Sequence, residues 1–177
     1  MNAWFNTFGF YTVDTSYMKL LNSIDSEVYY SNDPSYARKP FLGIVVAIGG
    51  YRCFIPLTSA KKRHEKWKRI DKSHFLVYET IDAKGVSKTD VIQRIPGDAT
   101  HVYKILAALD IKKMIPVLEK LYSKVDFEEE AKSDPDYANL LRKEFRFLKK
   151  YKQDILARVE KTYIDQKAYK TSPSVAL

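Results

Sequence analysis

A long apolar run that ends in two glycines constrains the fold of this chain more than any other feature. Phe41–Ile48 contains no polar side chain, Gly49-Gly50 follows it, and Tyr51–Leu57 is a second segment rich in aromatic and β-branched residues. Two adjacent glycines tolerate the positive φ angles of a type I′ turn, so the pattern predicts a β-hairpin. Because the first strand is apolar at consecutive positions, we expect both its faces to be buried and the strand to be central in its sheet.

The residues before the hairpin predict a strand, a helix and a loop. Phe8–Val13 has strand composition. Asp14 or Thr15 would then cap a helix that ends near Ile24, and its apolar face would carry Tyr17, Leu20, Leu21 and Ile24. The polar stretch Asp25–Lys39 is expected to be a long loop, and loops of this length are often functional.

The second half of the chain predicts further strands and then helices. Ser73–Thr80 is a strand candidate and Val86–Ile95 a weaker one, whereas residues 102–125 fit either a helix or a buried strand. Asp134-Pro135 supplies a helix cap and a proline in the first turn. Apolar residues then recur at helical spacing over residues 134–170, in a helix that is broken at most once: Tyr137, Leu140, Leu141, Phe145, Leu148, Tyr151, Ile155, Val159 and Tyr163. Residues 171–177 are expected to fray.

The order of these elements indicates the fold class. Strands come first and helices last, which is typical of an α+β protein with a mostly antiparallel sheet. The 177 residues suit a single domain, 1–177, with a helical C-terminal part. A single cysteine, Cys53, and three dispersed histidines argue against a disulfide framework and a structural zinc site. With no signal peptide pattern and no membrane-spanning run, the sequence is expected to be a soluble, cytoplasmic protein.

Positive charge is concentrated in one short segment. The chain has a formal net charge of +8, yet residues 1–60 are neutral. Lys61–Lys72 alone holds seven basic and two acidic residues around Trp67. A solvated surface loop is the simpler interpretation of such a run. A phosphate-binding patch is the alternative, because clustered cations displace counterions from a polyanion and an aromatic ring among them can stack on an unpaired base.

A pair of hydroxyls directly precedes this basic segment. Thr58 and Ser59 lie where the predicted second hairpin strand ends, and Lys61 follows at once. The hydroxyls could merely cap the next turn. They could also hydrogen-bond a phosphodiester while Lys61 neutralises developing negative charge. His64 could carry protons, although a lone histidine in a basic run is more often simply exposed.

Four blocks occur in order within about residues 10–64: Phe10-Tyr11-Thr12-Val13, Asp33-Pro34-Ser35-Tyr36, Lys39-Pro40-Phe41-Leu42-Gly43-Ile44-Val45 and Pro56-Leu57-Thr58-Ser59-Ala60-Lys61-Lys62. Together they resemble the ToxN/AbiQ family, the endoribonuclease toxins of type III toxin–antitoxin systems. The resemblance implies a compact, barrel-like antiparallel sheet with packed helices, similar to the MazF/Kid fold. It also implies RNA cleavage without a metal or other cofactor, by attack of the ribose 2′-hydroxyl, giving a 2′,3′-cyclic phosphate and a 5′-hydroxyl.

The same resemblance implies site residues and partners. The family's active-site tyrosine falls on Tyr36, its loop lysine on Lys39, its hydroxyl pair on Thr58 and Ser59, and the following lysine on Lys61. Arg38 is a possible substitute for Lys39. RNA contacts are expected at Arg38 and, within the basic run, at Lys62, Arg63, His64, Lys66, Trp67, Lys68 and Arg69. The implied partner is a small repeat RNA that folds as a pseudoknot, inhibits the toxin and assembles with it into a closed ring.

The sequence departs from the family pattern at two positions, and one alternative function is also open. Ala60 stands where the family often has proline, and Arg63 stands where it often has tryptophan, which affects the expected shape of a base pocket. A non-catalytic RNA-binding or translation-associated module could use the same basic segment. The expected partners are RNA in either case, with no DNA and no membrane.

Overall fold

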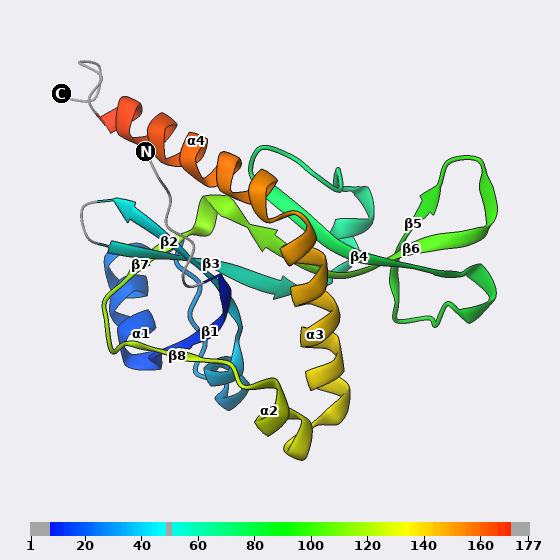
Figure 1. Cartoon of the computed structure of the whole chain (residues 1–177), viewed down its shortest axis with the longest axis horizontal. Helices are drawn as coiled ribbons and strands as arrows, with labels where there is room; N and C mark the ends of the chain where they lie inside the picture. Colours follow the sequence, from blue (N-terminus) through cyan, green and yellow to red (C-terminus); the bar gives the residue numbers. More distant parts are fainter. Residues whose placement is uncertain (1–7, 49–50, 171–177) are drawn as a thin grey trace.

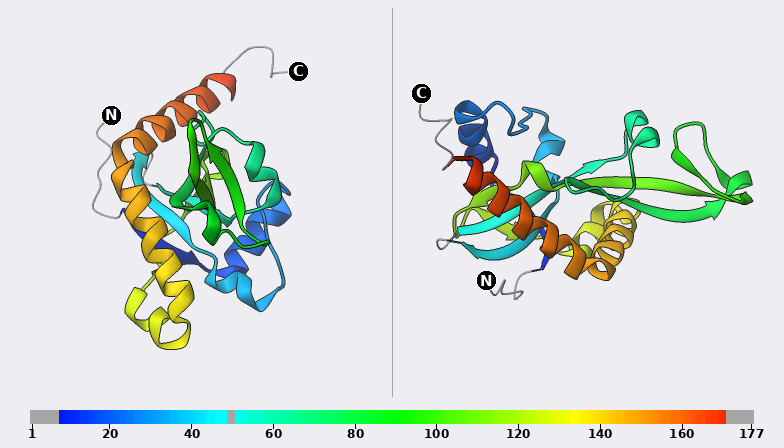
Figure 2. Two further views of the ribbon diagram at one scale, coloured as in Figure 1. Left: turned by 90° about the vertical axis from the view of Figure 1, so that its right-hand side faces the viewer. Right: turned by 90° about the horizontal axis from the view of Figure 1, so that it is seen from above.

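An antiparallel sheet with helices on both sides forms the body of the protein. The computed structural model describes residues 8–48 and 51–170. Helix α1 (Thr15–Ile24) lies on one side of the sheet, and α3 (Pro135–Lys150) and α4 (Lys152–Lys170) lie on the other (Figures 1 and 2). The strands are β1 (Gly9–Val13), β2 (Phe41–Ile48), β3 (Tyr51–Ser59), β4 (His74–Asp82), β5 (Val91–Ile95), β6 (Asp98–Asp110), β7 (Ile115–Val117) and β8 (Tyr122–Lys124). The mixed α and antiparallel β class is therefore confirmed.

The sheet is built around the predicted hairpin. Its strand order is β4-β6-β3-β2-β1-β8, with β5 paired to β6 and β7 paired to β3. Strand β2 lies between β1 and β3, so its predicted central place is confirmed, and the pairs Phe41↔Pro56 and Leu42↔Ile55 confirm the antiparallel pairing. The Gly49-Gly50 turn lies outside the described residues. Pairing among the described strands is open at β4 and β8, so barrel closure stays a prediction.

Successive residues of the central strands point to opposite sides and fill two separate cores. Phe10, Leu42 and Ile55 belong to the core beneath α3 and α4, together with Leu141, Leu148, Ile155 and Val159 of those helices. Their chain neighbours Tyr11, Phe41 and Phe54 belong to the core beside α1. This alternation follows from the period of two of a β-strand, and it explains why the segment is a continuous apolar run.

The α1 face differs from the prediction. The helix begins and ends as expected, with the Asp14 side chain accepting a hydrogen bond from the Tyr17 amide. Met18, however, is the fully buried residue, whereas Leu20 is 54% and Ile24 is 76% exposed. Tyr17 and Leu21, which were predicted on this face, do pack against the core, so the buried face is centred on Met18 among the aromatic rings of β1, β2 and β3.

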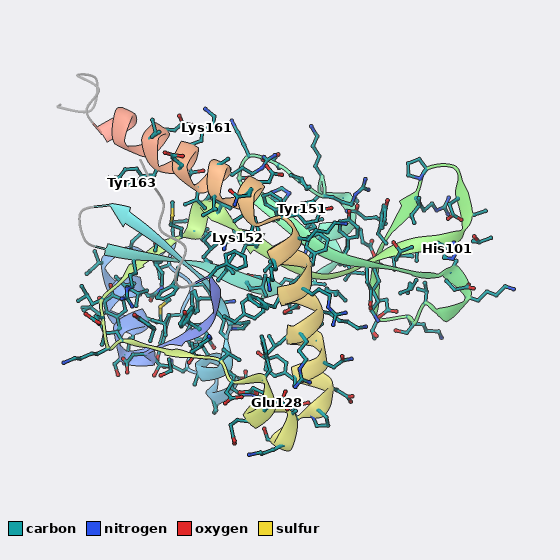
Figure 3. All side chains as sticks on the ribbon, in the orientation of Figure 1. His101, Glu128, Tyr151, Lys152, Lys161 and Tyr163 are labelled. Atoms are coloured by element: carbon teal, nitrogen blue, oxygen red, sulfur yellow. The ribbon has the colours of Figure 1, made fainter. Side chains whose placement is uncertain are left out.

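Several other elements differ in extent from those expected. The candidate strand Val86–Ile95 is a strand only from Val91, and residues 102–125 form strands with short turns between them. Helix α2 (Phe127–Ser133) was not predicted, and the C-terminal helix breaks once, at Tyr151, which Figure 3 labels at the junction of α3 and α4. Residues 171–177 lie outside the described residues. Within the described ranges, no helix is both long and apolar enough to cross a membrane.

A three-stranded arm projects from the body. The outer parts of β4, β5 and β6 form it, as Figure 2 shows, and His101 is labelled near its far end in Figure 3. At its base, the Lys143 ammonium of α3 forms a 2.8 Å ion pair with Glu79 of β4. The basic segment after β3 lies against this arm, because the Gln93 amide of β5 donates hydrogen bonds to the carbonyls of His64 and Trp67.

Candidate functional site

A pocket opens where β3 ends. Its volume is about 380 Å³, within the range of small-ligand sites. Four basic side chains and one acidic side chain line it, beside two hydroxyls and several apolar groups: Lys39, Lys61, Arg63, Lys113, Asp110, Thr58, Ser59, Met18, Tyr29, Phe41 and Pro56. The structure therefore brings together four of the five residues that the family resemblance placed in the active site, from segments about twenty residues apart in the sequence.

Thr58 and Ser59 are held by the sheet itself. Strand β3 pairs with β6 through Leu57↔Leu109, Thr58↔Ala108 and Ser59↔Ala107. The ladder continues one step further, because the Ala60 amide donates to the Leu106 carbonyl at 3.1 Å. Thr58 is half-buried and Ser59 is exposed, so both hydroxyls have a fixed backbone and are open to a ligand.

Lys61 follows on a turn that a buried histidine stabilises. The Lys61 amide donates to Nδ1 of His64 at 3.1 Å, at the start of the short 3-10 helix η2 (Lys62–Lys66). His64 is fully buried and its ring packs on Trp67 at 4.6 Å between centroids. The expectation that His64 is exposed is therefore wrong, because the ring lies inside the turn, and an RNA contact at this residue stays a prediction. Burial, reinforced by Arg63 and Lys61, lowers the pKa of His64 and favours the neutral ring that accepts this bond.

Lys39 enters the pocket from the opposite side. Its Nζ donates to the Leu57 carbonyl at 3.2 Å and lies 5.7 Å from the centroid of the Tyr29 ring. Burial, together with the nearby Lys61 charge, lowers the pKa of Lys39 to about 8. The side chain is therefore a cation that can lose its proton near neutral pH, which an ordinary surface lysine does not do.

The tyrosine of the pocket is Tyr29, which sequence reasoning missed. Tyr36 is buried, and its hydroxyl donates to the Tyr29 carbonyl at 2.6 Å. Burial raises the pKa of Tyr36 to about 12. The Tyr36 ring also packs edge-on against Tyr29 and Tyr30, with centroids 5.7 and 5.4 Å apart. Tyr36 thus supports the loop that carries Tyr29, and Tyr29 lines the pocket.

Arg38 points away from the pocket. Its guanidinium forms a 2.7 Å ion pair with Glu130 and lies 4.5 Å from the centroid of the Tyr137 ring, at the junction of α2 and α3. Of the two neighbouring cations, Lys39 lines the pocket and Arg38 does not. The geometry therefore favours Lys39 over Arg38 as the cation of the site.

The rest of the basic segment divides into exposed cations and packed side chains. Lys62, Arg63, Lys66 and Lys68 are exposed. Trp67 is half-buried, with its ring between His64 and His74, so it stabilises the turn. The Arg69 guanidinium lies 4.4 Å from the centroid of the Tyr103 ring on the arm. RNA contacts at the exposed cations, at Trp67 and at Arg69 stay predictions.

Asp110 and Lys113 also line the pocket without having been predicted. They belong to the end of β6 and to the turn η4 (Ile111–Lys113). The sequence offered only a weak signal for them: a charged pair after a buried apolar run, at a strand end. In the part of the chain that the structure describes, no three His, Cys, Asp or Glu side chains gather as a metal-binding group.

Comparison of the sequence with known proteins identifies relatives across most of the chain. A family model described as toxin ToxN of type III toxin–antitoxin systems matches residues 9–175. The endoribonuclease ToxN of Bacillus thuringiensis subsp. kurstaki is 30% identical over 156 residues, which are 88% of this chain and 67% of that protein. The endoribonuclease ToxN of Pectobacterium atrosepticum is 30% identical over 141 residues, 79% of this chain and 70% of that protein.

Solved structures agree with the sequence comparison. A toxin from a study of selective inhibition by a non-coding RNA pseudoknot matches with a TM-score of 0.65 and 27% identity, over 87% of this chain and 76% of its own. A structure of a bacterial antiviral system regulated by a processed non-coding RNA matches with a TM-score of 0.67 and 27% identity. The match covers 93% of this chain and 90% of the chain in that structure. AbiQ, a lactococcal anti-phage endoribonuclease, shares the fold with a TM-score of 0.55 and 17% sequence identity. The match covers 88% of this chain and 79% of the AbiQ chain. The chain thus belongs to the ToxN family of type III toxin–antitoxin toxins.

Proposed function

We propose that this chain is an endoribonuclease toxin that cleaves RNA without a metal ion and leaves a 2′,3′-cyclic phosphate and a 5′-hydroxyl. Membership of the ToxN family supports the activity. The observation that carries it is the pocket at the end of β3, which places the Thr58 and Ser59 hydroxyls beside Lys39 and Lys61.

The pocket offers what internal attack on a phosphodiester requires. Such a reaction needs the phosphate held in line with the 2′-oxygen and its developing negative charge stabilised. Thr58 and Ser59 can donate hydrogen bonds that orient the phosphate, since both project from the fixed end of β3. Lys61 and Lys39 then neutralise charge as the pentavalent phosphorus forms. Tyr29, which is 64% exposed, offers an aromatic surface on which a neighbouring base can stack.

The exposed cations beside the pocket would hold the RNA on either side of the cut. Lys62, Lys66 and Lys68 are exposed in the segment that follows the pocket residue Lys61 and would contribute sequence-independent affinity through phosphate contacts. Arg63 lines the pocket and belongs to the same segment. The proposed groove therefore joins the catalytic pocket to a basic surface.

The proposed partner is a small repeat RNA that folds as a pseudoknot, is cut from a precursor by the toxin and stays bound as its inhibitor in a closed ring. The related toxin inhibited by an RNA pseudoknot and the related RNA-regulated antiviral system support this partner. A role in anti-phage abortive infection, a cytoplasmic location and a barrel-like, MazF/Kid-like sheet belong to the same proposal.

Cleavage of a mixed RNA pool by the purified chain tests the activity. We expect new ends that carry a 5′-hydroxyl and a cyclic phosphate, with no loss of cleavage in EDTA. Ser59→Ala should lower the rate by roughly 10²–10³-fold, the effect of removing one donor aimed at a developing oxyanion. Ser123→Ala, at an exposed position on β8, is the matched control and should cut normally. Loss of cleavage in EDTA that magnesium restores would refute the metal-independent mechanism.

Binding of RNA separates this proposal from a non-catalytic RNA-binding module. Ser59→Ala should leave a multi-repeat precursor uncut while binding one pre-cut repeat with nearly unchanged affinity, because one hydrogen bond contributes about 0.5–1.5 kcal/mol to binding. A wild-type chain that binds the repeat and cuts no RNA would favour the non-catalytic module instead.

Salt dependence tests the basic groove. Replacing Lys62 or Lys66 by alanine should weaken RNA binding and reduce the slope of log affinity against log salt by about one unit for each phosphate that is no longer neutralised. Lys149 and Lys150, exposed at the end of α3, are the control positions. Equal effects at both places would indicate a diffuse positive field and contradict a defined groove.

A further inference from the structure

The pocket contains one carboxylate among its four cations, and phosphate binding does not explain it. Asp110 at the end of β6 is the acidic residue of the lining. A negative charge repels a phosphate, so an acidic side chain in a phosphate-binding pocket needs a separate physical reason. Part of the reason is structural, because the Lys112 amide and the nearby cations interact with the carboxylate. A further role that its chemistry allows is to take up a proton from a ligand in the pocket.

The β3–β6 register places Asp110 on the same face as Thr58. Leu57 pairs with Leu109 and Thr58 with Ala108. Since side chains alternate along a strand, Asp110 shares a face with Ala108 and hence with Thr58 across the ladder. Diagonal neighbours of this kind lie about 7–8 Å apart between Cα atoms. The two side chains accordingly line the same pocket.

The surrounding cations leave the carboxylate of Asp110 without a salt bridge. Lys113, three residues along, pairs with the Glu27 carboxylate and donates to the Glu27 carbonyl at 3.2 Å. Lys39 donates to the Leu57 carbonyl. Among the described residues, no cation lies within ion-pair distance of Asp110.

Burial makes Asp110 take up a proton more readily than an exposed carboxylate does, although the charges around it act in the opposite direction. The groups that face it are Lys112 and Lys113 on its own turn and His74 on β4, with Lys39, Lys61 and Arg63 around the pocket. Burial outweighs the opposing effects of Lys113, the Lys112 amide, His74 and the Lys112 charge, so the pKa of Asp110 is raised. A general base works best when its pKa is closer to the working pH than that of a free carboxylate.

We propose that Asp110 is the general base that removes the proton from the attacking ribose 2′-hydroxyl. The Asp110 carboxylate accepts this proton as the 2′-oxygen forms a bond to phosphorus. The bond from phosphorus to the 5′-oxygen breaks, and that oxygen takes a proton from water. The resulting hydroxide removes the proton from Asp110, which restores the starting state. This inference rests on the proposed ribonuclease function and names the proton acceptor in that same site.

Single-turnover cleavage across pH 5–9 tests the role. The probes are an oligonucleotide that contains a site mapped in the RNA pool and the same oligonucleotide with a 2′-deoxy sugar at the cut, which binds but cannot react. Asp110→Asn should cut about 10²–10⁴-fold more slowly, the usual contribution of general acid–base catalysis. Its rate should also lose the rise with pH that the wild type shows at low pH. Its affinity for the deoxy probe should be equal to or higher than that of the wild type, since Asp110 binds no phosphate and the substitution removes a charge that repels one.

Two further variants control the experiment. Asp165→Asn makes the same carboxylate-to-amide change on the exposed surface of α4 and should behave as the wild type. Asp110→Glu retains a carboxylate, so it should recover part of the cleavage rate and also the rise of that rate with pH at low pH. If Asp110→Asn does not fold, as judged by circular dichroism, Asp110→Ser replaces it in the same assays with the same expectation.

The outcomes distinguish the inference from the proposed function. A wild-type chain that cuts no RNA refutes the function, and the inference falls with it. The inference alone is refuted if the wild-type chain cuts RNA and Asp110→Asn cuts within ten-fold of that rate. It is also refuted if the rate of Asp110→Asn still rises with pH at low pH as the wild-type rate does. Equal losses of cleavage and of deoxy-probe binding would make Asp110 an anchoring residue. A changed cleavage motif at an undiminished rate would make it a base-reading residue, and either result overturns the proposal.

Discussion

Glu144 is a carboxylic acid in the interior, and its burial predicts an unusual dependence of stability on pH. It lies on the buried face of α3 with Ala138, Leu141 and Leu148, and its side chain is 3% exposed. Within the described ranges it has no cationic partner within ion-pair distance. Burial raises the pKa of Glu144 to about 8 from its ordinary value of 4.5, so the folded protein holds this proton at neutral pH.

The sign of the effect follows from proton counting. Between pH 4.5 and about 8 the folded chain retains the Glu144 proton and the unfolded chain has released it. Stability therefore falls as pH rises through this window, by about 1.4 kcal/mol per pH unit from this group. The loss of unfolding free energy caused by Glu144 is absent below pH 4.5 and complete above pH 8, where it reaches on the order of 4–5 kcal/mol.

Glu144→Gln removes the ionisation while keeping the size and shape of the side chain. Urea unfolding of both proteins at pH 5, 7 and 9 measures the difference directly, because ionisation of other groups largely cancels between them. We expect similar free energies of unfolding at pH 5 and a growing advantage for Glu144→Gln toward pH 9. Tyr137, the ionisable neighbour that interacts with Glu144, has a pKa raised to about 12 and stays neutral throughout. A difference that is constant across the three pH values would refute a buried neutral Glu144.

Three further predictions concern packing and the pocket. A Cβ at Gly43 would lie 2.4 Å from the Phe54 ring, so Gly43→Ala should destabilise the protein by about 1–3 kcal/mol in urea unfolding, and an unchanged midpoint would contradict this packing. His64→Phe removes both the acceptor for the Lys61 amide and a buried Nε2 that has no partner among the described residues. We expect cleavage to fall while the melting temperature changes little, and full activity would show that this bond does not hold Lys61. Because the pKa of Lys39 is about 8, the cleavage rate should decline above pH 8 as the ammonium is lost. The rate of Lys39→Arg should instead stay constant up to pH 9.5. Parallel declines of the two rates would exclude Lys39 as the cation of the site.

Much of the fold could be predicted because its signals are local. The apolar hairpin strands, the Asp14 cap of α1 and the helical spacing of Leu141, Leu148 and Ile155 all depend on nearby residues. The orientation of α1 could not be predicted, since Leu20 and Met18 are both apolar and the choice between them depends on aromatic rings from three distant strands. The structure of residues 102–125 was equally undetermined, because strand pairing there involves β3 and β4.

The site was predictable where it is contiguous and not where it is assembled from distant segments. Thr58, Ser59 and Lys61 lie within four residues of each other, so their shared chemistry is visible in the sequence. Tyr29 and Asp110 reach the same pocket from segments far away in the chain. The exposure of His64 was wrongly predicted because a basic run suggests an exposed segment, whereas its buried ring accepts the hydrogen bond that holds the turn.

Strand β3 pairs with three different strands, and this has a consequence for how the pocket can be switched off. Pairing to β2, β6 and β7 fixes β3 along its length, and its last residues form one wall of the pocket. Distorting that wall would require breaking the β3–β6 pairing at Leu57, Thr58 and Ser59, directly after a stretch of β3 that β2 and β7 hold on both sides. Strands in such a core open only at a high free-energy cost. An inhibitor therefore gains nothing by bending the pocket and must compete for it by occupying it. We therefore expect that raising the substrate concentration overcomes the inhibition. We also expect that the amide hydrogens of β3 exchange with solvent equally slowly with and without a bound inhibitor.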